Sequence, residues 1–404
     1  MSNKTAHKTV SIKNVESTIV LVTLGMTLLS QLFIPFVLAM NSIENILYIP
    51  LVAVLFTSST VNFKQIPLYF HLLFALALSI FISNLINGIT LSGVLFAFRP
   101  IKYYVIAVAA FSFYPYLKAE FKQILTTVII LSLSINLLML INPFGWGVSL
   151  MKLYSNHAAN YELNSEISKN FRLFGTFNSP NDNGIFWGLI LTFIISFKTF
   201  FKPSFRNTLV LLSLIFIVFT QSRTSILALV IALSILYVLR SFKIKSILII
   251  AIGLFVGYFI LVNSGLSYLK QITNFNIFKI QSLTSRYDAW EACIDLWKQH
   301  KILGIGNSKS ALVLTGYHPD SEYIYLLLSG GISLVVAYFL FFTAGITHSF
   351  NQLKNNPNSI FFIVAGVFIL INAITNYSFV NPEIAVLFIF FSAVTISQEK
   401  SLTK

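Results

Sequence analysis

The chain has 404 residues, of which 56% are hydrophobic and 10% are charged, and its mean hydropathy is +0.81. A soluble domain carries roughly 25% charged residues, so this composition excludes a protein with an ordinary polar surface. The formal net charge of +14 is compatible with nucleic-acid binding, but the basic residues are scattered between apolar runs. The preference of Lys and Arg for the cytoplasmic side of a membrane explains most of them, so we predict no nucleic-acid partner.

Apolar runs near the length that crosses a bilayer recur from one end of the chain to the other. They are continuous rather than alternating, which favours helices over a transmembrane barrel. We therefore predict an all-α fold, a polytopic membrane helical bundle of about twelve transmembrane helices in a single integral membrane domain, residues 1–404. The predicted spans are approximately 17–38, 43–60, 66–86, 93–117, 123–142, 184–201, 207–221, 224–239, 246–263, 321–347, 359–379 and 383–398.

The distribution of Lys and Arg predicts the orientation of the bundle. With the N-terminus in the cytoplasm, most basic residues between spans lie inside, and the short outer turns near 39–42, 87–92 and 380–382 carry none. Both termini are then cytoplasmic, and two long segments, about 143–183 and 264–320, lie outside. We expect the second of these to carry chemistry or recognition, because long polar loops amid membrane spans commonly do so.

Arginines at the predicted outer side are candidates for binding an anion. Arg99 lies within an apolar run, Arg223 in the short turn Gln221-Ser-Arg-Thr-Ser, and Arg286 in the long loop, while Arg172 ends the first outer loop. An arginine at the centre of the bilayer costs about 2.5–3.5 kcal/mol, so such a residue usually has a partner or a task. The alternative is an interfacial arginine that extends to lipid headgroups. At a helix N-terminus, Arg223 and exposed N–H groups would suit a phosphate or pyrophosphate.

The loop at 264–320 contains an expected amphipathic helix. Its apolar side chains recur at helical spacing at Trp290, Cys293, Ile294 and Trp297, with charged residues between them. We expect this helix to lie on the outer face of the membrane, with its tryptophans at the interface. Arg286 would begin it and could instead pair with a nearby carboxylate of the same helix.

Three residues stand where this loop returns to the membrane: His318, Asp320 and Glu322. A histidine or carboxylate there could accept a proton from an attacking hydroxyl group. The alternative for the two acidic residues is capping of the next helix, with Asp320 or Ser321 as the cap and Glu322 in the first turn. The sequence contains no phosphate-binding P-loop and no metal-ligand spacing, so we predict no metal and no cofactor, and chemistry that draws on an activated substrate.

Four motifs in this order resemble the bacterial O-antigen ligase and polymerase superfamily, over roughly residues 90–345. They are Arg172-Leu-Phe-Gly-Thr-Phe-Asn-Ser-Pro-Asn, Gln221-Ser-Arg-Thr-Ser, Ser285-Arg-Tyr-Asp-Ala-Trp with Gly304-Ile-Gly306, and Ser321-Glu-Tyr-Ile-Tyr-Leu-Leu-Leu-Ser-Gly-Gly331. The resemblance implies a metal-independent membrane glycosyltransferase in the bacterial cytoplasmic (inner) membrane. Its donor would be a glycan on undecaprenyl pyrophosphate, and its acceptor a glycan or lipid A–core. A chain-length regulator and a flippase are the further partners that it implies, beside the lipid bilayer itself.

The resemblance carries over to single residues. Arg223 and Arg286 match arginines thought to hold the donor pyrophosphate, with Arg172 and Arg99 as further candidates. In ligases a histidine opens the last motif, but Asp320 occupies that position here and His318 stands two residues earlier. This departure favours a polymerase over a ligase. A flippase or other transporter is a third hypothesis, although its polar residues should gather at mid-membrane rather than at one outer face.

Overall fold

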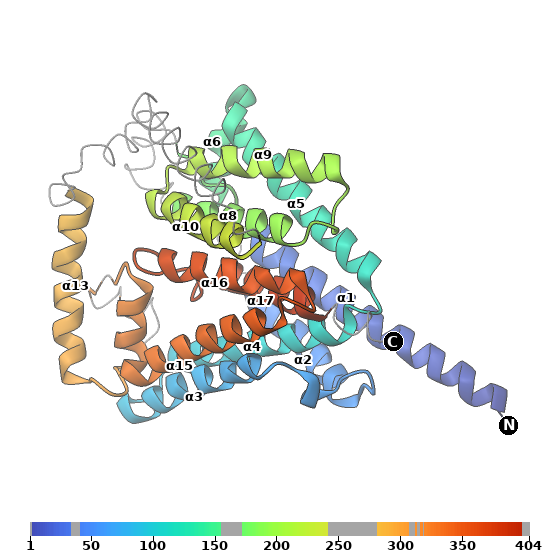
Figure 1. Cartoon of the computed structure of the whole chain (residues 1–404). Helices are drawn as coiled ribbons and strands as arrows, with labels where there is room; N and C mark the ends of the chain where they lie inside the picture. Colours follow the sequence, from blue (N-terminus) through green and yellow to red (C-terminus); the bar gives the residue numbers. More distant parts are fainter. Residues whose placement is uncertain are drawn as a thin grey trace.

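The computed structural model describes residues 2–33, 41–154, 172–240, 281–306, 312, 316–317 and 319–397. In these ranges the secondary structure is helical, with no strand, so the all-α prediction is confirmed for this part of the chain. Short 3₁₀ helices at Phe63–Gln65, Pro143–Gly145 and Pro357–Ser359 lie in three connections. The α-helices (Figure 1) are α1 (Ser2–Phe33), α2 (Asn41–Thr57), α3 (Leu68–Asn87), α4 (Leu91–Phe113), α5 (Lys118–Ile141), α6 (Trp146–Tyr154), α8 (Pro180–Ser196), α9 (Pro203–Thr220), α10 (Arg223–Arg240), α13 (Gln281–Gln299), α15 (Glu322–Gln352), α16 (Ile360–Asn372) and α17 (Pro382–Ser397).

Six of the described helices are long and apolar enough to cross a membrane, namely α3, α4, α5, α9, α10 and α15. Shorter apolar stretches lie in α1 and α2, at Pro357–Asn372 and at Pro382–Ser397. This pattern is that of a multi-pass membrane protein. The total of about twelve spans stays a prediction, and the predicted span at 246–263 lies outside the described residues.

The interior of the bundle is built on α8 and α17, which are buried on nearly every side. A helix that is apolar all round is stable only when neighbours or lipid cover every face. Phe193 of α8 stacks on Phe391 of α17 with ring centroids 4.1 Å apart. Around this pair, α16 packs against α8, α10 and α15, while α4 packs against α17 and α3 (Figure 1). Several helices of the bundle therefore end beside the loops that are described below as the candidate site.

The helix predicted in the long loop is present as α13, and it runs across the direction of α3, α4 and α16 (Figure 1). Cys293 is buried on its inner face, whereas Asp288 and Glu291 are exposed. The amphipathic pattern in the sequence thus corresponds to one face against the bundle, where α13 contacts α15. Its location outside the cytoplasm stays a prediction.

Within α15 the helix is interrupted at Gly331, where φ is 64° and ψ is −159°. The two arms, residues 322–330 and 332–352, fold back toward each other. The ring of Tyr323 in the first arm lies 6.1 Å from that of Tyr338 and 5.5 Å from that of Phe339 in the second arm. The span predicted at 321–347 corresponds to α15, but it is not one continuous helix, because a conformation open to glycine breaks the helix there.

The segment at residues 301–306, between α13 and α15, fills this interruption. Ile305 N–H donates to the Leu328 carbonyl at 2.6 Å, and Ile332 N–H donates to the Lys301 carbonyl at 3.0 Å. Asn87 of α3 also donates to the carbonyl of Gly304 at 2.9 Å. Backbone groups freed inside an apolar layer need such partners, so the returning segment makes the break tolerable.

The predicted span at 359–379 extended too far, because α16 ends at Asn372. The side chain of Asn372 donates to the Phe368 carbonyl at 2.9 Å in the last helical turn. Residues 373–381 then form a connection that we call the α16–α17 loop. Apolar residues in this loop hid its start in the sequence. The N–H groups of residues 373–376 still bond to carbonyls of α16, whereas the Ala373 and Thr375 carbonyls accept from residues of α15 and α13.

Candidate functional site

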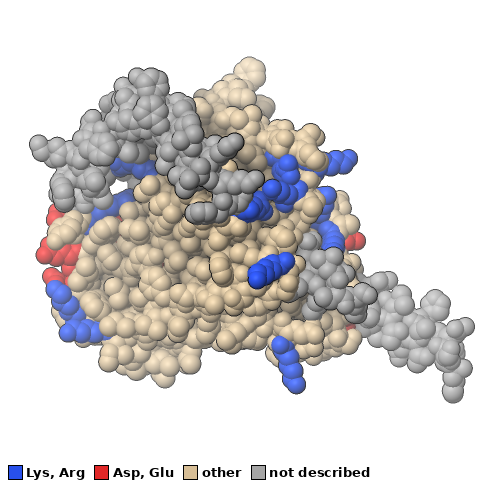
Figure 2. Space-filling view, in the orientation of Figure 1, with Lys and Arg blue, Asp and Glu red and all other residues tan. Residues whose placement is uncertain are grey.

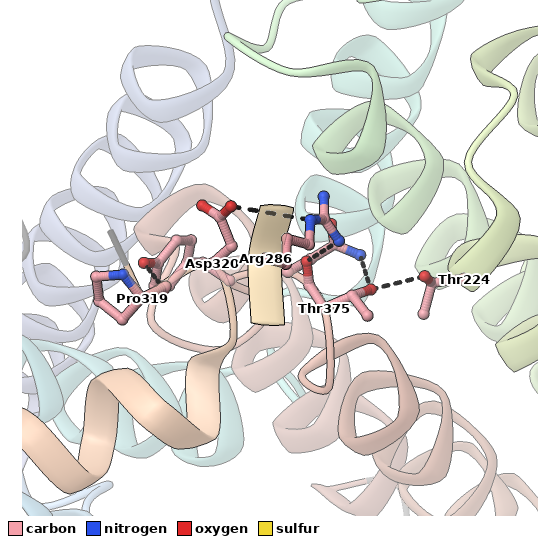
Figure 3. Close-up of polar contacts among 7 residues, drawn as sticks. Thr224, Arg286, Pro319, Asp320 and Thr375 are labelled. Carbon is pink, nitrogen blue, oxygen red and sulfur yellow. Dashed lines mark hydrogen bonds and ion pairs between the residues drawn. The ribbon is translucent and has the colours of Figure 1, made fainter. Parts of the chain in front are cut away.

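The α16–α17 loop joins the segments that the sequence singled out. Glu322 N–H, at the start of α15, donates to the Ala373 carbonyl at 2.9 Å. Arg286 Nη1 of α13 donates to the Thr375 carbonyl at 3.4 Å. The hydroxyl of Thr375 bonds to that of Thr224, at the start of α10, with 2.6 Å between the oxygens (Figure 3). Sequence reasoning missed this loop; the one available signal was Thr375-Asn376, a polar pair within an apolar run.

Arg286 and Asp320 form an ion pair at this loop. The distance from Arg286 Nε to Asp320 Oδ2 is 3.8 Å, and the two side chains are 28% and 49% exposed (Figure 3). The sequence left open a pairing of Arg286 with a carboxylate of its own helix. In the structure its partner is Asp320, which lies just before α15. An ion pair this exposed is weak, so a ligand could exchange for either member.

Arg223 is the first residue of α10, and the turn before it is tightly bonded. Gln221 adopts a left-handed conformation with φ of 52°, which ends α9 and reverses the chain. Ser222 Oγ donates to Ser225 Oγ at 2.9 Å, and Ser225 Oγ donates to Asn372 Oδ1 at 2.9 Å. The turn is thereby joined to the end of α16, with Arg223 at the positive end of a helix.

Arg172 holds this same turn in place through its hydrogen bonds. It is 8% exposed, its Nε donates to the Thr220 carbonyl at 3.0 Å, and its Nη2 donates to Asn181 Oδ1 at 2.9 Å. Asn181 lies in the first turn of α8, which Ser179 caps by accepting from the Asn181 N–H. Arg172 therefore links the start of α8 to the end of α9, and its role as a pyrophosphate ligand stays a prediction.

Arg99 lies on α4, with its guanidinium carbon 5.6 Å from the centroid of the Phe96 ring. It borders a small cavity that Tyr338, Phe379 and Val380 also line. Phe379 and Val380 belong to the α16–α17 loop. Arg99 therefore lies near the last residues of this loop, whereas Thr375 lies near its start.

Glu322 is completely buried. Its Oε2 accepts the backbone N–H of Phe379 at 2.8 Å and that of Ser378. Ser321 occupies the cap position of α15 without a side-chain cap bond, and its hydroxyl donates instead to the Ala373 carbonyl at 3.3 Å. The Glu322 carboxylate therefore holds the α16–α17 loop at the start of α15, and its predicted catalytic role stays a prediction.

The residue before Asp320 is held by Tyr377, whose hydroxyl donates to the Pro319 carbonyl. Burial raises the pKa of Tyr377, and the nearby charge of Asp320 adds to this effect. The Tyr377 phenol therefore stays protonated, and its hydrogen bond to Pro319 holds the segment that leads into α15. His318, the third predicted catalytic residue, lies outside the described residues.

Within the described part of the chain, no three His, Cys, Asp or Glu side chains are grouped to hold a metal ion. What the described residues do assemble is a cationic site with one partly exposed carboxylate at the ends of several membrane helices. Arginine side chains in such a place suit an anionic ligand.

A family model described as O-antigen ligase matches residues 208–339. This match confirms the resemblance to the O-antigen ligase and polymerase superfamily. It runs from α9 into the second arm of α15 and includes Arg223, Arg286 and Asp320, whereas Arg99 and Thr375 lie outside it. No curated protein sequence matches the chain.

Proposed function

We propose that this protein is a membrane glycosyltransferase that polymerises undecaprenyl-pyrophosphate-linked oligosaccharide repeats into O-antigen, capsular polysaccharide or exopolysaccharide. The reaction would take place on the outer face of the cytoplasmic membrane. The observation that carries the proposal is that Thr375 contacts both Arg286, which pairs with Asp320, and Thr224, the neighbour of Arg223.

The proposed reaction is a direct displacement. A hydroxyl oxygen of the acceptor sugar attacks the anomeric carbon of the donor glycan, and its proton passes to the Asp320 carboxylate. The bond from the anomeric carbon to the pyrophosphate oxygen breaks, and undecaprenyl pyrophosphate leaves with the bonding electron pair. Arg223 and Arg286 stabilise the negative charge that develops on this leaving group. We expect inversion, because a single direct displacement at the anomeric carbon inverts its configuration.

The other predicted residues take supporting roles in this proposal. Arg172 and Glu322 hold the turn before α10 and the α16–α17 loop, respectively. Arg99 would meet a more distant part of the lipid-linked donor, beside Phe96. His318 remains a second candidate for accepting the proton.

The second candidate function is that of an O-antigen ligase, which transfers the finished polymer to lipid A–core. The description of the matching family favours it. The carboxylate of Asp320 beside Arg286, at the position where ligases carry a histidine, favours the polymerase. A gel of surface polysaccharide from a strain that lacks the gene separates them: a collapse to single repeats supports the polymerase, and long polymer that remains on its lipid carrier supports the ligase.

The shared mechanism is tested by Arg223→Ala and Arg286→Ala. Removing a group that stabilises the leaving-group charge should lower the rate of transfer about 10²–10³-fold for each variant. Arg206→Ala is the matched control, because Arg206 lies at the other end of α9 and donates to the Lys198 carbonyl. Full polymer yield from both site variants at normal expression would refute the mechanism.

A further inference from the structure

We infer that Thr375 is a positioning residue that holds the turn carrying Arg223 at a fixed spacing from Arg286; this inference rests on the proposed function. Two different groups of Thr375 make the connection. Its carbonyl accepts from Arg286 Nη1 at 3.4 Å, and its hydroxyl bonds to Thr224, the neighbour of Arg223, at 2.6 Å. One residue of the α16–α17 loop therefore contacts both segments that carry the candidate pyrophosphate ligands (Figure 3).

The loop on either side of Thr375 is held in place by other bonds. Before it, Asn372 accepts from Ser225 Oγ at 2.9 Å, and its carbonyl accepts from the Thr375 N–H at 3.2 Å. After it, the buried Glu322 carboxylate accepts from Phe379 N–H at 2.8 Å. Because the residues on both sides of it are held, the backbone of Thr375 cannot shift freely. The hydrogen bond of its side chain to Thr224 therefore fixes the position of the first turn of α10.

Loss of this arrangement would lower the rate of the reaction and would leave binding of the acceptor unchanged. Cationic groups stabilise a developing charge best when they are already in place, since no energy is then lost in reorganising them. Loss of the Thr375 hydroxyl would let the first turn of α10 drift relative to α13. The stabilisation of the leaving pyrophosphate would fall, whereas contacts with the acceptor sugar would remain.

The experiment uses the full-length protein, purified in detergent, with lipid-linked glycan extracted from cells that lack this gene as both donor and acceptor. Thr375→Val removes the hydroxyl at nearly constant shape, and Thr375→Ser restores it. Thr224→Val removes the same hydrogen bond from its other side, which covers the case in which Thr375→Val does not fold. Thr192→Val is the matched control, because that buried hydroxyl bonds only within its own helix, to the Leu189 carbonyl.

The Thr375 hydroxyl also accepts a hydrogen bond from the Asn376 side chain at 3.3 Å. We expect Thr375→Val to lower kcat about 5–20-fold, the size of effect that follows from losing these two hydrogen bonds, with the acceptor KM unchanged. Thr375→Ser should stay within about twofold of the wild type, as should Thr192→Val. The double variant Thr224→Val with Thr375→Val should lose no more than Thr375→Val alone, because Thr375→Val already breaks the bond that Thr224→Val removes.

Three outcomes would overturn the inference: wild-type kcat in Thr375→Val while Arg286→Ala is impaired, equal losses in Thr375→Ser and Thr375→Val, or additive losses in the double variant. The first of these leaves the proposed function standing. Absence of transfer by the wild-type protein, to repeats and to lipid A–core alike, would instead overturn the proposed function and this inference together.

Discussion

Two carboxylates only two positions apart, Asp320 and Glu322, have opposite surroundings. Asp320 is about half exposed and faces Arg286, whereas Glu322 is buried and accepts two backbone N–H groups of the α16–α17 loop. A proton acceptor must be reachable by the hydroxyl it serves, so the exposed member of the pair suits that role. The buried member suits the role of holding the loop, because it satisfies donors that would otherwise lie unpaired in an apolar interior.

Amide substitutions separate these two roles. Asp320→Asn keeps the shape but cannot take a proton, so we expect transfer to fall about 10²–10⁴-fold with an unchanged melting temperature. Glu322→Gln keeps an acceptor oxygen and should lose less than tenfold in rate. Glu322→Ala leaves two buried donors without partners, at a cost of about 1–3 kcal/mol for each, and should lower the melting temperature.

Transfer rates and thermal unfolding in detergent check both residues on the same preparations. A full rate in Asp320→Asn would exclude it as the proton acceptor and make His318 the residue to substitute next. A strong loss of rate in a well-folded Glu322→Gln would restore the catalytic role first predicted for Glu322.

At the scale of elements, the interrupted helix α15 and the segment 301–306 act as one unit. The backbone of that segment bonds to residues on both sides of the break at Gly331, and α3 contributes Asn87 and Ser83 to the same contact. Since the segment follows α13 directly, the break anchors the end of the helix that carries Arg286. The position of Arg286 thus depends on a glycine in a different helix.

Gly331→Ala tests this anchor. A Cβ at Gly331 would clash with the carbonyl atoms of Ile302, and the backbone conformation there is one that other residues rarely adopt. We expect a destabilisation of at least about 1–3 kcal/mol, the usual cost of such backbone strain, together with loss of transfer.

Gly366→Ala on α16 is the control, because its Cβ would meet its nearest neighbour at 3.5 Å, an ordinary contact. It should be neutral or slightly stabilising, as alanine favours a helix by about 1 kcal/mol over glycine. Equal melting temperatures for the two variants, measured by thermal unfolding, would mean that the break does not anchor α13.

Across the whole molecule, acidic side chains lie at opposite edges of the face in Figure 2, and the broad tan area between them carries only scattered Lys and Arg side chains. One edge lies over α13, where Asp288, Glu291 and Asp295 are exposed. A surface poor in charged side chains is expected where lipid surrounds a protein. On the predicted orientation, α13 and the candidate site face outward, and the turn between α4 and α5 faces the cytoplasm.

Cysteine labelling tests that orientation. Cys293 is the sole cysteine of the chain and is buried, so Cys293→Ser provides a background without reactive thiols. Tyr287→Cys on α13 and Tyr116→Cys after α4 replace side chains that are 65% and 68% exposed. In spheroplasts, a membrane-impermeant maleimide should label position 287 at once and position 116 only after permeabilisation. Labelling of position 116 in intact spheroplasts, or of neither position, would reject the predicted topology.

Much of the architecture was determined by the sequence alone, because it depends on composition and on local pattern. The apolar runs predicted the membrane class and most helices, the spacing of Trp290, Cys293 and Trp297 predicted α13, and the exceptional arginines indicated an anionic ligand. Each of these properties follows from residues within one or two helical turns of one another.

Only the tertiary structure decided how these parts meet. Thr375 and Thr224 are 151 positions apart, and no local pattern marks either as the partner of the other. The end of α16, the fold-back of α15 and the choice of Asp320 over Glu322 as the exposed carboxylate all depend on backbone groups that find their partners in distant segments. In an apolar layer every such group must be paired, and it is the packed fold that selects the pairing.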